Sequence, residues 1–217
     1  MYSAKNELNV GIMTQPHAQF STRPDEALQR LMDGNKRFVQ GFDAPDSFKY
    51  QDLSIRHKQH PYACILGCAD SRVSPEHAFD ESHGNLFVTR VAGNVVTPEI
   101  LASLEYGTSV LGASLIMVLG HSGCGAVHAS IDAVSVQAQF LGQIGHLLKS
   151  LEPAILESRH TNPETWMEHA IIQNVLRNVE ILRQSEPVLA GLIRAGRLKV
   201  AGGVYHLENG QVSLLSE

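Results

Sequence analysis

Two cysteines and a histidine have the types and spacing in this sequence that favour metal binding. His121 and Cys124 lie three residues apart in a glycine-broken segment, directly after the apolar run 115–119. In a turn that leads into a helix from Ala126, this spacing lets one imidazole and one thiolate converge on a single ion, as in zinc sites. Alone, the pair is a modest signal, because a metal site needs further ligands.

Cys68 is the third candidate ligand, because it follows a second apolar run that also ends in glycine. That run is 62–67, and His121 comes 53 residues after Cys68. If the two runs form neighbouring parallel strands, Cys68, His121 and Cys124 meet at their carboxyl ends, where open α/β sheets place their sites. Three protein ligands leave one position of a tetrahedral zinc ion open, which is the catalytic arrangement.

The elements that must position these residues alternate between short apolar runs and amphipathic helices. This alternation predicts an α/β fold with a parallel sheet and right-handed crossovers. Strands are expected at 62–67, 86–91, 115–119 (ending at Gly120) and 198–207, with 211–215 as a hairpin partner. Helices are expected at 22–41, 97–111, 126–151 (with a possible break near Ser135), 164–184 and shortly after Pro187. A polar connector is expected at 151–163.

We expect residues 1–217 to form a single domain, since a chain of this length buries a sizeable core and contains no linker or repeat. Residues 1–41 form an N-terminal arm and helix, which either lies across the domain or reaches a second subunit. Residues 42–60 are expected to be a loop with a short helix.

Composition excludes several classes of partner. The formal net charge of −5 and the lack of any Lys/Arg run predict no nucleic-acid and no membrane binding. The first twenty residues contain no continuous apolar core, so neither a signal peptide nor a membrane span is expected there. Three cysteines, an odd number, argue against a disulfide framework and favour a cytoplasmic location.

The motif Cys68-x-Asp70-x-Arg72, followed by His121-x-x-Cys124, resembles that of the β-class carbonic anhydrases. The resemblance covers roughly residues 24–215, with a zinc-site core at 59–127. It implies a central parallel four-stranded sheet of order 2-1-3-4 with an antiparallel fifth strand, flanked by helices. Further matches are Phe87-Val-Thr-Arg90, Gly93-Asn94, Leu104-Glu105-Tyr106 and Gly203-Val-Tyr205.

The resemblance implies reversible hydration of carbon dioxide to bicarbonate and a proton, with one Zn²⁺ per chain held by the two cysteines and the histidine. Zinc lowers the pKa of bound water from about 15.7 towards about 7. Asp70 is expected to orient the zinc-bound hydroxide, and Arg72 to hold Asp70 by a bidentate ion pair.

Within this family the aspartate is in some members the fourth zinc ligand, which closes the site. Members that switch between the two forms carry a tryptophan three residues before the first ligand, where this chain has Ile65. The only tryptophan is the distant Trp166. We therefore expect Asp70 to leave the zinc site open.

By the same resemblance, four residues line the carbon dioxide pocket: Gln59, Phe87, Ala92 and Tyr106. Ala92 stands where a valine is usual. Some of these side chains are donated across a dimer interface in the family, which predicts a homodimer or a multiple of dimers. Phe87 and Tyr106 fit core packing equally well, and Cys64 is expected to be a core residue.

Two alternative functions remain open from the sequence. Relatives with this fold hydrolyse carbonyl sulfide or carbon disulfide with the same ligands. A non-catalytic nucleotide-binding module is suggested by Gly120-x-x-Gly123-x-Gly125 between a strand and a helix. The glycines do not follow the G-x-G-x-x-G order, however, and no P-loop lysine is present.

Overall fold

The computed structural model of the chain describes residues 20, 22–41, 59–160 and 162–216. Within these residues, five strands form one sheet in the order β2-β1-β3-β4-β5. The arm predicted over 1–21 falls almost wholly outside the described residues, as does most of the loop predicted over 42–60. The strands are β1 (Ala63–Gly67), β2 (Leu86–Arg90), β3 (Leu115–His121), β4 (Lys199–Tyr205) and β5 (Val212–Ser216).

The pairing of these strands confirms the predicted α/β class. β1 is parallel to both of its neighbours, β2 and β3, and β3 is parallel to β4. β5 is antiparallel to β4. The carboxyl ends of β1 and β3 therefore lie side by side at one end of the strands.

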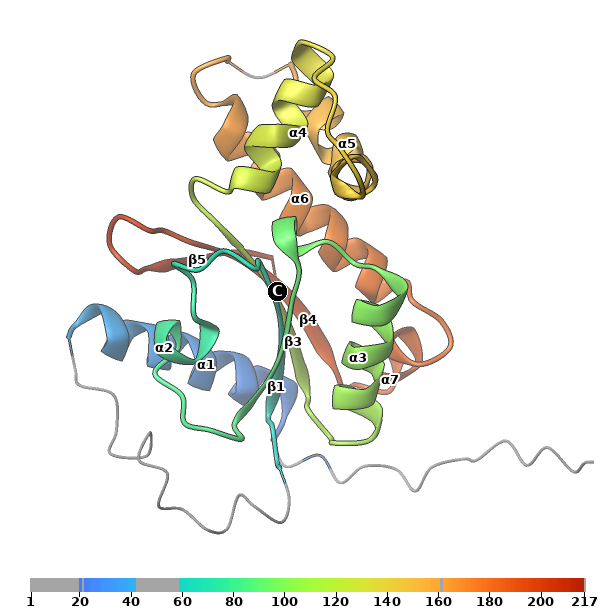
Figure 1. Ribbon diagram of the computed structural model, residues 1–217. Helices are drawn as coiled ribbons and strands as arrows, with labels where there is room; N and C mark the ends of the chain where they lie inside the picture. The colour runs from blue at the N-terminus through green and yellow to red at the C-terminus, as the bar shows by residue number, and fades with distance from the viewer. Residues whose placement is uncertain (1–19, 21, 42–58, 161, 217) are drawn as a thin grey trace, which may run out of the picture.

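Helices cover both faces of the sheet (Figure 1). α1 and α2 lie on one side, α3, α6 and α7 lie on the other, and α4 and α5 stand beyond the carboxyl ends of the strands. The helical elements are α1 (Pro24–Val39), α2 (Pro75–Ala78), the 3₁₀ turn η3 (Ala92–Asn94), α3 (Pro98–Ser109), α4 (Gly125–Ser135), α5 (Ile144–Ser158), α6 (Trp166–Arg183) and α7 (Leu189–Arg194). None of the helices in the described part of the chain is both long and apolar enough to cross a membrane.

Successive side chains of the central strands point to opposite faces of the sheet, which produces two apolar cores, one on each face. In β1, Cys64 and Leu66 pack with α3 to α7, whereas Ala63 and Ile65 pack with α1 and α2. Every residue of β1 and β3 is buried, as expected for parallel strands covered on both sides.

The first helix lies across the sheet of its own chain. Leu31 of α1 is fully buried against the second face. The amide of Asn35, also buried, donates to the carbonyls of Ala78 and Gly210 at 2.8 Å each and accepts from the N–H of Val212 at 2.8 Å. These bonds tie α1 to α2 and to the β4–β5 hairpin.

The third strand is longer than predicted. The apolar run predicts a strand that ends at Gly120, but β3 continues through Gly120 and His121. These two residues pair with Val204 and Tyr205 of β4, so the neighbouring strand extends β3 beyond its apolar run.

The connector predicted over 151–163 was wrong, because α5 continues through Pro153 to Ser158. Leu151 and Ile155 lie on its buried face and are fully excluded from solvent. Their burial outweighs the one helical hydrogen bond that a proline removes. The predicted break near Ser135 is confirmed, since α4 ends there.

α6 packs closely on β3 and β4 at two glycines. A Cβ atom on Gly202 would lie 2.8 Å from Cγ1 of Val175 and 2.9 Å from Cγ2 of Val179. A Cβ atom on Gly120 would lie 2.6 Å from Cγ2 of Val175. Branched valine side chains have little freedom to withdraw, so the distance between α6 and the sheet depends on these glycines.

We expect Gly202→Ala to lower the free energy of unfolding by about 1–3 kcal/mol, because the added methyl forces α6 away from the sheet. Urea denaturation measures the change. The matched control is Gly191→Ala in α7, where an added Cβ meets no atom within 4 Å; this change should be neutral or stabilising by up to about 1 kcal/mol. Equal effects of the two substitutions would contradict the packing argument.

Candidate metal centre

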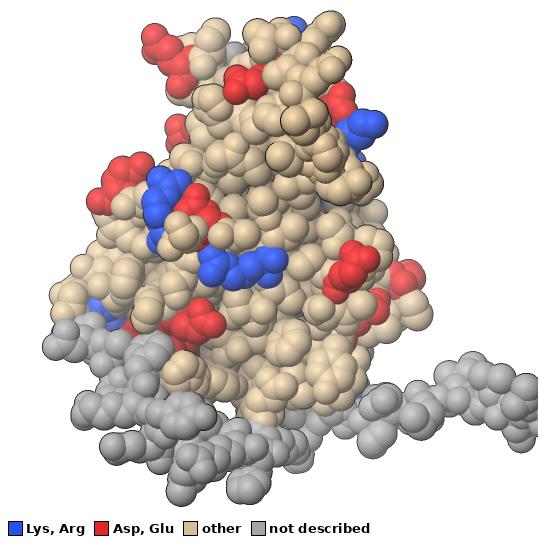
Figure 2. All heavy atoms as spheres, in the orientation of Figure 1, with Lys and Arg blue, Asp and Glu red and all other residues tan. Residues whose placement is uncertain are grey.

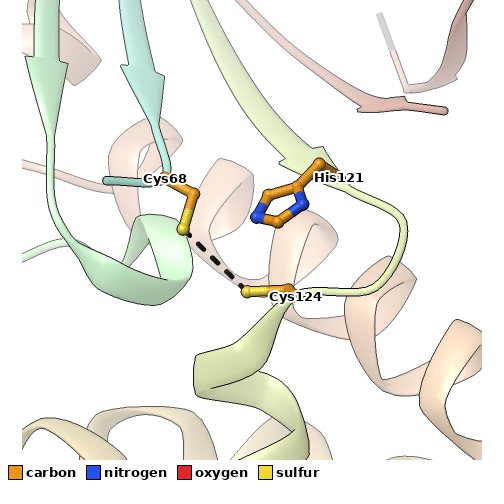
Figure 3. Close-up of side chains that lie close together, drawn as sticks. All are labelled: Cys68, His121 and Cys124. Atoms are coloured by element: carbon orange, nitrogen blue, oxygen red, sulfur yellow. Dashed lines mark hydrogen bonds between the residues drawn. The ribbon is translucent and has the colours of Figure 1, made fainter. Parts of the chain in front are cut away.

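Cys68, His121 and Cys124 come together at the carboxyl ends of β1 and β3. Cys68 follows β1 directly, His121 is the last residue of β3, and Cys124 immediately precedes α4. One ligand atom from each residue lies within 4.8 Å of the other two, and all three side chains are buried (Figure 3). The register of β1 and β3 thus brings Cys68 close to His121, although 53 residues separate them in the sequence.

The spacing of the two sulfurs suits a tetrahedral ion. The Sγ atoms of Cys68 and Cys124 are 4.0 Å apart. Zinc–sulfur bonds of about 2.3 Å at a tetrahedral angle place two sulfurs about 3.8 Å apart. A donor set of two thiolates and one imidazole also matches the ligand preference of zinc.

The imidazole of His121 offers one nitrogen to a metal. Its Nδ1 lies 2.9 Å from the carbonyl oxygen of Ser122, which assigns the ring proton to Nδ1. Nε2 is buried and has no hydrogen-bond partner among the described residues. A buried polar atom without a partner is costly, and a cation bound to Nε2 would satisfy it.

The two thiols differ in their affinity for protons. The pKa of Cys68 lies well below its ordinary value, chiefly because the Cys124 thiol donates a hydrogen bond to it. The pKa of Cys124 is raised, because its proton is held by Cys68 and because burial disfavours a second charge. A cation bound to both sulfurs must displace the proton of Cys124, so metal binding weakens as the pH falls.

Asp70 and Arg72 form a bidentate ion pair beside the three ligand candidates. Arg72 donates from Nε to Oδ1 at 3.0 Å and from Nη2 to Oδ2 at 2.8 Å, and its backbone N–H donates to Oδ1 at 3.0 Å. These bonds hold the pKa of Asp70 well below its usual range. Oδ2 of Asp70 lies 3.9 Å from Nε2 of His121, so the carboxylate faces the cluster.

Arg90 braces the segment that carries Cys68 and Asp70. It donates from Nε to the carbonyl of Cys68 at 2.8 Å and from Nη2 to the carbonyl of Asp70 at 2.6 Å. Arg90 belongs to the motif Phe87-Val-Thr-Arg90, but its place in the sequence predicts no role for it. Its partners are backbone carbonyls, which carry no sequence signal.

The four predicted pocket residues do not all come together within one chain. Ala92 lies in η3, next to Gly93, whose N–H contacts Cys68, whereas Gln59 precedes β1 and lies at the opposite end of that strand. Phe87 on β2 and Tyr106 on α3 contact each other, with ring centroids 6.2 Å apart. Tyr106 is 49% exposed, so its ring is not fully packed in the core.

Cys64 is a core residue and lies outside the cluster. Its side chain is fully buried, and burial raises the pKa of its thiol. A Cβ on Gly107 of α3 would come within 2.5 Å of its Sγ, so this sulfur packs directly against the helix backbone.

Comparison with known proteins identifies relatives of the chain. A family model described as carbonic anhydrase matches residues 63–212. A carbonic anhydrase from Mycolicibacterium smegmatis is 36% identical over 197 residues, which cover 90% of this chain and 95% of the relative.

Solved structures agree with this match. The β-carbonic anhydrase CcaA has a TM-score of 0.69 at 28% identity, covering 88% of this chain and 92% of that chain. A structure of tetrameric β-carbonic anhydrases from Sordaria macrospora has a TM-score of 0.68 at 23% identity, covering 75% and 84% of the two chains, and shares the fold.

We expect Cys68→Ala, His121→Ala and Cys124→Ala each to reduce bound zinc from about one per chain to near zero, since two ligands hold zinc poorly. Atomic absorption after dialysis measures the content, and circular dichroism checks folding. Cys64→Ala, which removes a buried thiol outside the cluster, should keep its zinc. A Cys68→Ala protein with full zinc occupancy would contradict the site.

Proposed function

The chain belongs to the β-carbonic anhydrase family, and on that basis we propose that it hydrates carbon dioxide reversibly at a zinc ion held by Cys68, His121 and Cys124. Carbon dioxide hydration is the general reaction of this family of zinc lyases. The observation that carries the proposal is the convergence of two sulfurs and the unpartnered Nε2 of His121 in one buried place.

Zinc bound there would act as a Lewis acid that lowers the pKa of water from about 15.7 to about 7, which makes hydroxide available near neutral pH. The remaining work falls to the protein side chains. They must orient the nucleophile and exclude competing ligands.

Asp70 is the residue that we propose to orient the nucleophile. Because Arg72 lowers its pKa, the carboxylate stays ionised and can only accept hydrogen bonds at neutral pH. A hydroxyl group that donates to Oδ2 has its lone pairs directed away from Asp70, towards an incoming carbon atom. The ion pair with Arg72 fixes this direction.

Arg72 also keeps Asp70 from acting as a ligand, in our proposal. Both carboxylate oxygens accept hydrogen bonds from its guanidinium, and its Nη2 additionally lies 3.3 Å from the carbonyl of Gly123. Moving Asp70 onto the metal would break the bidentate pair. This supports the open form, as does Ile65 at the position of the switching tryptophan.

We further propose that a second copy of the chain completes the substrate pocket. Gln59 lies at the far end of β1 from the cluster, and Tyr106 is half exposed, so neither closes the site of its own chain. Much of the face in Figure 2 carries no charge, with basic and acidic side chains gathered in small groups. A neutral surface of this kind suits a protein interface, whose buried centre is poor in charged residues.

We propose the cytoplasm as its location, on the state of the cysteines. Cys64, Cys68 and Cys124 are all free thiols. Thiols that must remain reduced to bind metal are compatible with a reducing compartment.

We expect Asp70→Asn to retain zinc but to lose about 100-fold or more in the rate of carbon dioxide hydration, because the amide both donates and accepts and orients the nucleophile poorly. Stopped-flow measurement with a pH indicator gives the rate. The control is Asp25→Asn, which removes an exposed carboxylate paired with Lys199 away from the cluster. If both variants turned over at the wild-type rate, Asp70 would have no part in catalysis.

Light scattering should give a mass that is an even multiple of the 23.7 kDa chain. Tyr106→Asp places a charge on the proposed contact surface, so it should lower both the mass and the hydration rate. A monomer with full activity would refute the shared pocket.

A further inference from the structure

The turn η3 lies beside Cys68, and two buried asparagines of α6 form hydrogen bonds to it and to the backbone that follows it. We propose that Asn174 and Asn178 are positioning residues of the metal centre, which fix this turn so that the N–H of Gly93 donates to Cys68. The inference rests on the proposed role of Cys68 as a ligand and extends it to residues more than a hundred positions away in the sequence.

The direct contact on the ligand comes from the backbone. The N–H of Gly93 donates to Sγ of Cys68 at 3.3 Å. Such a bond offsets part of the charge of a thiolate and holds the sulfur in one orientation. Hydrogen bonds of this kind to metal ligands set how strongly the ligand binds.

Gly93 can point its N–H at the sulfur only in this particular turn. Its φ of +75° is in the left-handed region that favours glycine. A Cβ on this residue would also lie 2.9 Å from Cδ1 of Leu151 in α5. The position of the N–H therefore depends on what holds the turn in place.

Two amides of α6 hold the turn and the backbone that follows it. Nδ2 of Asn174 donates to the carbonyl of Gly93 at 2.8 Å, and Oδ1 of Asn178 accepts from the N–H of Val96 at 2.7 Å. Nδ2 of Asn178 also donates to Oδ1 of Asn174 at 3.0 Å and to its carbonyl at 2.8 Å. The chain of contacts runs from Asn178 through Asn174 and Gly93 to Cys68.

These asparagines interrupt a face of α6 that is otherwise apolar. Asn174 and Asn178 are only 1% and 3% exposed, and their buried neighbours on the helix include Ile171, Val175 and Val179. Burying an amide is unfavourable unless its hydrogen bonds are made. The amide hydrogen bonds run to η3, to the backbone that follows it, and between the two asparagines, which is why we assign the pair a role at the metal.

Loss of a group in the second layer around a metal typically costs about 10- to 100-fold in metal affinity or activity. We therefore expect Asn174→Ala to release metal about 10- to 100-fold faster than the wild type. The charge-transfer absorption from thiolate to cobalt should also shift, because Cys68 loses an oriented hydrogen bond.

The test uses the full chain loaded with Co²⁺ or Zn²⁺. Metal release to excess EDTA gives the rate, and the visible and near-ultraviolet spectrum of the cobalt form reports on the sulfur ligands. Thermal unfolding is measured on the same samples. The matched control is Asn35→Ala, which removes another buried asparagine that makes three hydrogen bonds to backbone groups, on the opposite face of the sheet.

Faster release and a shifted spectrum in Asn174→Ala, with neither change in Asn35→Ala, would support the proposal. If both variants lost similar stability and both kept the wild-type spectrum and release rate, Asn174 would be merely structural and the proposal would be overturned.

Asn178→Asp provides a graded variant, because it keeps an oxygen for Val96 but cannot donate to Asn174. It should produce a smaller change of the same kind.

A measurement on the wild-type sequence keeps the proposal testable if Asn174→Ala does not fold. In the chain loaded with ¹¹³Cd, a scalar coupling between cadmium and the amide proton of Gly93 would demonstrate the N–H···S bond. An uncoupled Gly93 amide that exchanges rapidly with solvent would overturn the proposal. None of these readouts needs carbon dioxide, so an inactive wild-type protein would refute the proposed function and leave this inference to its own test.

Discussion

The parallel pairing of β1 with β3 is the constraint on which the rest of the site depends. Gly67, the last residue of β1, pairs with Leu119 of β3. Cys68, which follows β1, and His121, at the end of β3, therefore lie at the same end of the sheet. Cys124 then needs only a short turn to reach both. A slip of one residue in this register would turn a ligand to the opposite face of the sheet, because successive strand side chains alternate.

Backbone groups supply most of the second layer around this centre. The carbonyl of Ser122 orients His121, the N–H of Gly93 reaches Cys68, and the carbonyls of Cys68 and Asp70 accept from the Arg90 side chain. Backbone groups are rigid once the fold is formed, so the contacts from Ser122 and Gly93 add no entropic cost of ordering a long side chain. The positions of the ligands therefore depend on elements as distant as α6.

The single chain brings the candidate metal ligands together fully and the expected pocket residues only in part. The ligand candidates are buried, whereas the aromatic residues Phe87 and Tyr106 lie at a sheet edge and on a partly exposed helix. This difference follows from their positions. The candidate ligands lie at the ends of central strands, whereas β2 is an edge strand, paired on one side only among the described residues.

The sequence by itself determined the α/β class, the places where strands end in candidate ligands, and the chemistry of two thiols and an imidazole. These properties follow from local periodicity, glycine positions and residue type, and the resemblance of Cys68-x-Asp70-x-Arg72 and His121-x-x-Cys124 supplied the sheet order. Only the tertiary structure decided that α1 lies on its own sheet, that α5 continues through Pro153, and that Arg90 and Asn174 reach backbone groups near Cys68. Each of these outcomes depends on packing or hydrogen bonds between segments that are distant in the chain. The local periodicity of the sequence does not report the free energy of such contacts.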